Sequence, residues 1–328
     1  MNRLALLMLV LPLAASAAPP ALTEVARIHV GGEARWDYLT IDSAAHRLYV
    51  SHATVTEVID TQADKVVGVI PDTAGVHGVA IAEDLGKGFI SDGRANAVTV
   101  FDLKSLQKTA TIGVGSNPDA ILYDPASHVV MTFNGKSRDV TFIDGASGKV
   151  VATVAVGGKP EFAQLGGNGL AWFNVEDTNE IAAVDPATAR LVRRVSLAPC
   201  DGPSGLAVDD QKRLYAVCGN RQMAVVGADA KLLAHPAIGA GPDGVAWMDG
   251  VAWSANGRDG TLSAVETTSG RFETVATLPS APGARTIAAD PATHRLYLPT
   301  AELQPAKAGE RPAGVPGTFY ILVLETRH

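Results

Sequence analysis

The sequence is built on a unit of about forty residues that returns seven times. Its clearest copy runs from Asn117 to Gly157, where turn residues separate four short apolar segments. The segments are Ala120 to Tyr123, Val129 to Phe133, Val140 to Ile143 and Val150 to Val156. Short apolar runs bounded by Asp-Pro, Asn-Gly and Ser-Gly turns are typical of strands. One unit is therefore predicted to be a four-stranded antiparallel meander, the size of one propeller blade.

The copies follow one another at a nearly constant spacing. The residues at the start of their first segments are 39 to 43 positions apart, which leaves no room for helices between copies. These residues, which we call the mouth ring, are Asp37, His77, Asp119, Glu161, Ser204, Asp243 and Arg285. A β-sandwich would not restart its pattern seven times. The chain is therefore predicted to be all-β, a single seven-bladed β-propeller of four-stranded antiparallel blades over residues 18–328.

The seventh copy is incomplete. Thr286 to Leu324 supplies three strands, and the apolar segment from Leu22 to Val30 has no copy of its own. We expect this N-terminal strand to close the last blade, because such closure removes the exposed edges that an open ring would leave.

The N-terminus has the three parts of a secretory signal peptide. A basic start is followed by the apolar run Leu4 to Leu13 and by the small residues Ala15-Ser16-Ala17. We predict a signal peptide over residues 1–17, cleaved after Ala17, and a periplasmic or secreted protein. An uncleaved anchor would need about 18 or more apolar residues, and Pro12 argues against it. No later run is long enough to span a membrane.

Charge argues against nucleic acid as a partner. The formal net charge is -7, and an acidic chain repels a phosphate backbone. Basic loop residues such as Arg94 and Lys136 alternate with acidic ones, which indicates a surface of mixed charge. A small molecule or a protein suits such a surface better, and we expect a monomer.

Two cysteines, Cys200 and Cys218, lie 18 positions apart. Export to an oxidising compartment and the expected hairpin register, which brings the two residues together, favour a disulfide. Metal ligation is the alternative, but two cysteines without a neighbouring histidine make a poor zinc site.

Several motifs resemble those of the YVTN/YncE-like family of propellers. They are Tyr49-Val50-Ser51-His52, Val58-Ile59-Asp60-Thr61 and Lys149 to Gly157. The resemblance covers residues 22 to 326 and implies seven blades in an exported bacterial protein, without implying an activity. The sequence departs from the pattern at Gly166-Gly167-Asn168-Gly169 and at the insertion from Glu302 to Gly317.

The mouth ring is where a site is expected. Neighbouring strands are antiparallel, so the first strand of each blade starts on the face where the second strand ends, and polar loops converge there. Turn chemistry explains any single member, since proline precedes Asp119, Glu161, Ser204 and Asp243. The whole set is harder to explain this way, because four carboxylates around one mouth repel each other. Arg285, a protonated His77, a divalent cation or a cationic ligand would offset that repulsion.

Two further residues are expected at this mouth. His52 ends a second strand and would approach His77 of the next blade, and Trp36 would supply an aromatic surface. The ligand-binding candidates are Trp36, Asp37, His52, His77, Asp119, Glu161, Asp243 and Arg285.

No complete catalytic motif is present, and Ser204 has no histidine base beside it. The leading hypothesis is an exported, non-catalytic propeller that binds a small ligand, a metal ion or a protein at the mouth. The alternative is a metal-dependent hydrolase or lyase, similar to lactonases and streptogramin lyases. In that hypothesis Asp119, Glu161 and Asp243 hold a divalent cation while His77 acts as acid or base.

Overall fold

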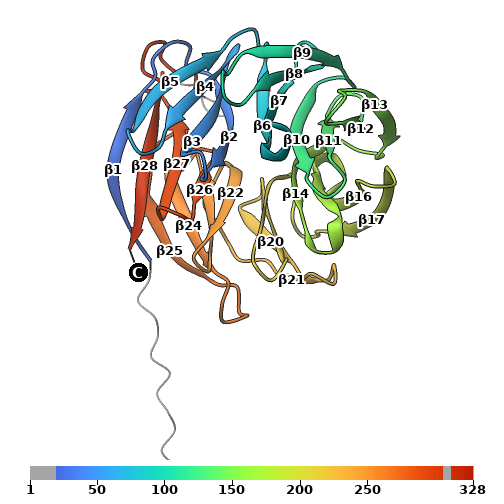
Figure 1. The fold of residues 1–328 in the computed structure, drawn as a ribbon. Coiled ribbons are helices and arrows are strands. Elements are labelled where there is room, and N and C mark those ends of the chain that lie inside the picture. The colour runs from blue at the N-terminus through green and yellow to red at the C-terminus, as the bar shows by residue number, and fades with distance from the viewer. Residues whose placement is uncertain (1–19, 306–311, 328) are drawn as a thin grey trace, which may run out of the picture.

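The computed structural model describes residues 20–305 and 312–327, so the predicted signal peptide lies outside the described residues. Seven four-stranded antiparallel sheets stand around a central axis (Figure 1). In each sheet the first strand lies innermost and the fourth outermost. The fold predicted from the repeat is confirmed, and the described residues contain no helix long and apolar enough to cross a membrane.

The first four blades follow the predicted spacing. Blade 1 holds β2 (Trp36–Asp42), β3 (Arg47–His52), β4 (Val55–Asp60) and β5 (Lys65–Ile70). Blade 2 holds β6 (Val76–Ala82), β7 (Lys87–Asp92), β8 (Ala97–Asp102) and β9 (Lys108–Gly113). Blade 3 holds β10 (Pro118–Asp124), β11 (Val129–Asn134), β12 (Asp139–Asp144) and β13 (Val150–Ala155). Blade 4 holds β14 (Pro160–Leu165), β15 (Ala171–Val175), β16 (Glu180–Asp185) and β17 (Arg190–Ser196).

The other three blades complete the ring. Blade 5 holds β18 (Pro203–Val208), β19 (Leu214–Cys218), β20 (Gln222–Val226) and β21 (Leu232–Ala234). Blade 6 holds β22 (Pro242–Met248), β23 (Val251–Asn256), β24 (Thr261–Glu266) and β25 (Thr274–Pro279). Blade 7 holds β26 (Ala288–Asp290), β27 (Arg295–Thr300), β28 (Tyr320–Arg327) and β1 (Ala21–His29). Three single-turn 3₁₀ helices lie in loops: η1 (Glu83–Leu85), η2 (Gly167–Gly169) and η3 (Glu176–Thr178).

The hydrophobic core lies between neighbouring blades. Second strands are buried on both faces, as in β15, whereas outer strands such as β13 alternate between exposed and half-buried residues. Phe133 of blade 3 packs on Phe173 of blade 4, with ring centroids 5.1 Å apart. Each blade therefore buries its faces only against its neighbours, and the ring must close to complete the core.

Innermost strands approach so closely that glycine is required. A Cβ on Gly205 would lie 2.6 Å from the Asp243 carbonyl oxygen, and one on Gly244 would lie 2.9 Å from the Thr286 Cα. These contacts hold the first residues of blades 5, 6 and 7 against one another, at the end of the channel where the mouth ring lies.

Turns on the opposite face have the predicted capping. Asp60, Asp102, Asp144 and Asp185 accept backbone N–H bonds from residues two or three positions later. His46, His128 and His294 have φ values of 54°, 54° and 55°, so their regular recurrence marks a turn position. These residues belong to the scaffold.

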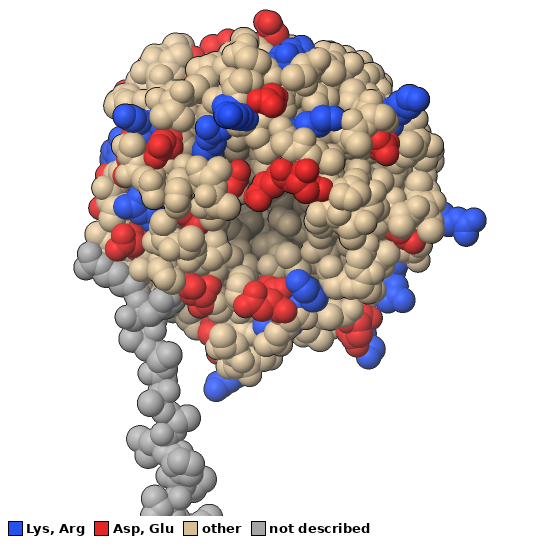
Figure 2. Space-filling model, in the orientation of Figure 1, with Lys and Arg blue, Asp and Glu red and all other residues tan. Residues whose placement is uncertain are grey.

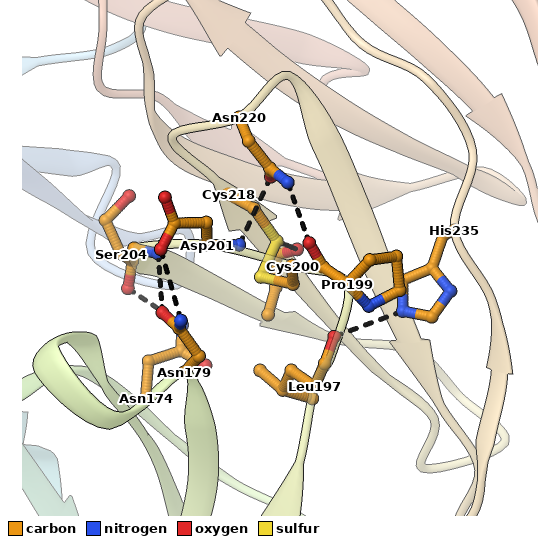
Figure 3. Close-up of a disulfide and its surroundings, with 12 residues drawn as sticks. Asn174, Asn179, Leu197, Pro199, Cys200, Asp201, Ser204, Cys218, Asn220 and His235 are labelled. Carbon is orange, nitrogen blue, oxygen red and sulfur yellow. Dashed lines mark hydrogen bonds between the residues drawn. A yellow bond between two sulfur atoms is a disulfide. The ribbon is translucent and has the colours of Figure 1, made fainter.

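The disulfide is confirmed. Cys200 and Cys218 are bonded, with Cα atoms 5.5 Å apart (Figure 3). Cys218 ends β19 opposite Pro203, and Cys200 lies just before that proline. Asn220 braces the same loop, since its side-chain amide donates to the Pro199 carbonyl at 2.7 Å.

Blade 7 departs from the expected pattern at its inner strand. β26 has three residues and begins at Ala288, three positions after Arg285. Arg285 therefore reaches the mouth from the segment that leads into the strand. The described part of the insertion forms a bridge between Leu303 and Gly314.

The N-terminal strand closes blade 7 as predicted. β1 pairs antiparallel with β28, and the two strands lie side by side as blue and red arrows in Figure 1. Ile28 of β1 is 3% exposed and packs in the cluster shared by blades 7 and 1. Closure therefore adds core contacts as well as backbone hydrogen bonds.

This closure predicts a difference between two residues of β1. We expect Ile28→Ala to lower the free energy of unfolding by about 2–4 kcal/mol, because it removes a buried side chain that joins two blades. Val25→Ala, on the same strand but 38% exposed, is the matched control and should cost well under half as much. Denaturant unfolding measures both, and equal losses would contradict a closing role for β1.

Candidate functional site

Bulges set the direction of the mouth-ring side chains. In blade 1 the pair Trp36 and His52 is followed by the pair Leu39 and Val50, so the ladder skips Asp37 and Tyr38. Similar register shifts occur at the same point of blades 2 to 6. A bulge turns side chains away from the regular alternation of a strand. Ring residues are thereby removed from the sheet pairing at the end of the channel.

Hydrogen bonds from one blade to the next fix the ring backbone. Ser51 of β3 donates to the His77 carbonyl at 2.8 Å, and Ser91 of β7 donates to the Asp119 carbonyl at 2.6 Å. The Asn174 amide of β15 donates to the Ser204 carbonyl at 2.9 Å (Figure 3). A buried polar side chain of a second strand thus holds a ring residue of the following blade.

Three ring residues form one cluster. His77 Nδ1 lies 2.5 Å from Asp37 Oδ2 and 3.6 Å from Asp119 Oδ1. Possible ligand atoms of the three side chains lie within 4.8 Å of one another. Among the described residues no other group of three or more His, Cys, Asp or Glu has this geometry. Blades 1, 2 and 3 each contribute one member.

Electrostatics favours a protonated His77. Burial alone lowers the pKa of His77, but the hydrogen bond to Asp37 and the charge of Asp119 outweigh it and raise the pKa to about 9. Burial raises the pKa of Asp119, and the neighbouring His77 opposes that shift. Imidazolium and carboxylates therefore stabilise one another inside the mouth.

Arg285 neutralises the other side of the mouth. Its Nε lies 2.8 Å from Asp243 Oδ2, and its Nη2 lies 3.8 Å from Asp37 Oδ1. The guanidinium also donates to the Trp36 carbonyl at 2.6 Å and lies over the Trp36 ring, 5.5 Å from its centroid. The predicted offset of carboxylate repulsion by Arg285 is present in this geometry.

Glu161 has a cationic partner that sequence reasoning missed. Lys159 Nζ lies 2.5 Å from Glu161 Oε1 and also pairs with Glu176. Burial and the charge of Asp119 raise the pKa of Glu161, while Lys159 lowers it. The signal was the local sequence Lys159-Pro160-Glu161, which places a cation two residues from the ring carboxylate.

Two aromatic rings meet across the channel. Tyr38 of blade 1 contacts Phe162 of blade 4 edge to face, with centroids 4.5 Å apart. The two residues directly follow Asp37 and Glu161, and blades 1 and 4 lie on opposite sides of the ring. Figure 2 shows that the ring is hollow at its centre on the drawn face. The aromatic pair therefore lies beside the mouth ring.

His52 lies apart from this cluster. Its Nδ1 is 3.0 Å from Glu57 Oε1, its Nε2 is 2.5 Å from the Glu33 carbonyl, and its ring stacks on Phe319. Both ring nitrogens of His52 thus contact residues outside the mouth ring, and His52 does not share a partner with His77. Trp36 also stacks on Phe319, so its ring supports Arg285 from the side.

The metal set expected from the sequence differs from the cluster in the structure. Of Asp119, Glu161 and Asp243, only Asp119 belongs to the cluster with His77. Glu161 pairs with Lys159 and Asp243 pairs with Arg285. Asp37, which the sequence placed among the ligand-binding candidates, takes their place beside His77 and Asp119.

Comparisons with known proteins identify the fold. No family model and no curated protein matches the sequence. Among solved structures, U3-55K is 10% identical with a TM-score of 0.76, covering 93% of this chain and 98% of that one. The RRP9 WD40 repeats are 10% identical with a TM-score of 0.77, covering 94% of this chain and 98% of that one. A streptogramin B lyase is 13% identical with a TM-score of 0.74, again covering 94% of this chain and 98% of that one. At this identity the likeness defines the class, a seven-bladed β-propeller, and the YVTN/YncE-like family remains a prediction.

The raised pKa of His77 predicts a pH dependence of stability. The folded-state pKa of about 9 exceeds the ordinary value of 6.5, so the contribution is complete below pH 6.5 and is lost as the pH rises through 9. Its upper size is roughly 3 kcal/mol. We expect His77→Gln to destabilise the protein markedly at pH 6 and much less at pH 10, as measured by denaturant unfolding.

The exposed His29 of β1 provides the control, since His29→Gln removes an imidazole far from the ring carboxylates. It should leave the unfolding free energy nearly unchanged at both pH values. A His77→Gln effect of the same size at pH 6 and pH 10 would show that the imidazolium does not stabilise the mouth.

Proposed function

We propose that this chain is an exported, non-catalytic binding protein that takes up a small ligand at the mouth of its channel. The observation that carries the proposal is the shape and chemistry of this mouth. Charged side chains of six blades surround it, and the rings of Tyr38 and Phe162 meet beside them. A closed, mostly pre-formed cup with a few converging polar groups is the usual form of a small-molecule site.

Rigidity supports this proposal. Backbone carbonyls of His77, Asp119 and Ser204 are held by hydrogen bonds from the preceding blades, so the ring does not have to be ordered when a ligand binds. A binding site that is already organised loses less conformational entropy on association. The disulfide supports export, because such bonds persist in oxidising compartments.

A panel of small molecules tests the proposal. Organic cations, organic anions and neutral compounds of similar size are added to the chain that begins at Ala18, and thermal stability is measured for each. We expect at least one class to raise the midpoint by several degrees, as binding to the folded state requires. Amide NMR shifts then locate each hit, and the expected residues are Tyr38, Asp119 and Phe162. Hits that shift only residues outside the mouth, or no hits in any class, would refute the proposal.

A metal-dependent hydrolase or lyase is the second candidate. It is favoured by the distance of 4.8 Å or less between ligand atoms of Asp37, His77 and Asp119. One imidazole and two carboxylates suit a first-row divalent cation, provided that His77 gives up its proton. A bound cation would act as a Lewis acid on a carbonyl or leaving-group oxygen. The streptogramin B lyase among the similar folds makes cyclic esters reasonable substrates to test.

This candidate makes a distinct prediction. If it is correct, Mn²⁺ or Zn²⁺ will raise the thermal midpoint of the wild-type chain, and Asp119→Asn will abolish the increase. Asp229→Asn, which changes an exposed turn carboxylate of blade 5, controls for loss of charge and should leave the increase intact. Streptogramin B and simple lactones are then incubated with the metal-loaded protein. No midpoint change with either ion and no product would eliminate the enzyme hypothesis.

A further inference from the structure

The mouth carries more negative than positive charge. Five carboxylates, those of Asp37, Asp119, Glu161, Glu176 and Asp243, share three cationic side chains, those of His77, Lys159 and Arg285. Two negative charges remain in excess when every group is ionised. A cation that enters this network gains from the excess, whereas an anion meets repulsion.

Asp119 is the carboxylate with the weakest compensation. Its closest ion pair, with His77, spans 3.6 Å, while His77 lies 2.5 Å from Asp37. No described cationic side chain donates a hydrogen bond to the Asp119 carboxylate, although that side chain is only 12% exposed. A buried carboxylate gains strongly from a donor that carries a positive charge.

One buried hydroxyl group at the mouth, that of Ser204, has no hydrogen-bond partner among the described residues, and a second, that of Tyr38, lies among the carboxylates. Tyr38 is 6% exposed, and the carboxylates of Glu161, Asp243, Asp119 and Asp37 all act on its phenol, so its side chain lies among them. Ser204, at the equivalent ring position of blade 5, is 9% exposed and its Oγ is unpaired. Unpaired buried hydroxyls are uncommon because each costs free energy. The Ser204 hydroxyl is therefore available to a donor from outside the chain.

The aromatic pair of Tyr38 and Phe162 supplies a surface that attracts cations. Phe162 is half-buried and meets Tyr38 edge to face, so an aromatic surface lies beside the carboxylates. Aromatic faces attract ammonium groups, and the attraction grows when water is excluded. Anions and hydrated metal ions gain no such attraction from the aromatic pair.

We propose that the ligand of this mouth is a small organic cation with a primary ammonium group, an inference that rests on the proposed function. The ammonium has three donors, which match the Asp119 carboxylate, the Tyr38 hydroxyl and a second ring oxygen. Its alkyl part packs on the Tyr38 and Phe162 rings. A primary ammonium is preferred to a quaternary one, because the latter has no N–H donor for the Asp119 carboxylate or for the unpaired Ser204 hydroxyl.

Matched compounds test this assignment on the mature chain. Isothermal titration at low salt compares n-butylamine, 1,4-diaminobutane, n-butanol, tetramethylammonium and butyrate. We expect the two primary amines to bind, the diamine more tightly because of the two excess charges, and n-butanol and butyrate not to bind. Tetramethylammonium should bind at least tenfold more weakly than n-butylamine. A lysine-containing tripeptide distinguishes a free amine from the side chain of a partner protein.

Variants place the binding at the mouth. Asp119→Asn keeps the shape of the side chain and should weaken amine binding at least tenfold. Tyr38→Phe, which removes only the hydroxyl, should weaken it several-fold, and Phe162→Leu should do the same by removing the aromatic face. Asp229→Asn should bind like the wild type. Each variant is first shown to unfold cooperatively, and Tyr38→Phe keeps the test decisive if Asp119→Asn does not fold.

The outcomes separate this inference from the function on which it rests. Amine binding that weakens in the mouth variants supports both. Binding of butyrate or n-butanol at the mouth, without amines, overturns the inference and leaves the binding function intact. Binding of the tripeptide alone assigns the ammonium to a protein partner and overturns the free amine. Amine binding that is equal in all variants, or no binding at the mouth by any compound, overturns the inference.

Discussion

Hydrogen bonds from second strands to the backbone of the next blade are the constraint on which the mouth depends. Ser51, Ser91 and Asn174 lie fully buried in the second strands of their blades. A buried donor left without a partner costs roughly 1–3 kcal/mol, so each of these side chains has to reach the neighbouring carbonyl. The ring residues of blades 2, 3 and 5 are thereby held to the preceding blades, and their bulged positions keep a fixed direction.

Because the mouth ring is fixed, its carboxylates lie close to one another. Cationic side chains pair with them and offset the repulsion. Asp37 and Asp119 approach the same imidazole, so His77 keeps its proton at neutral pH. Asp243 pairs with Arg285, itself a member of the mouth ring, and Glu161 pairs with Lys159, which lies two residues before it. Burial raises the cost of any unpaired carboxylate. Local charge balance and a site that favours cations are thus two results of one geometry.

The period of the repeat predicted the propeller fold, the closure of blade 7 by β1 and the positions of the mouth ring. These features depend on the alternation of apolar and polar residues within strands and on the number of strands. Contacts across the channel could not be predicted in the same way. Tyr38 and Phe162 are 124 positions apart, and their meeting depends on two bulges whose direction no local pattern specifies. His52 was expected at the mouth because it ends a strand. Glu57 of β4 and the carbonyl of Glu33, which lies in a loop, hold its ring away from His77.

The aromatic pair of Tyr38 and Phe162 bears on how this propeller would select a ligand. Propellers with 10% identity share this scaffold, so the scaffold itself carries little information about the ligand. Tyr38 and Phe162 contact each other across the ring, in positions that directly follow Asp37 and Glu161. The selectivity of such a site resides in the few side chains beside the aromatic pair, where no described cationic side chain donates a hydrogen bond to Asp119 and the Ser204 hydroxyl has no partner among the described residues. A ligand that supplies a charged donor to these two groups satisfies what the chain itself leaves unsatisfied.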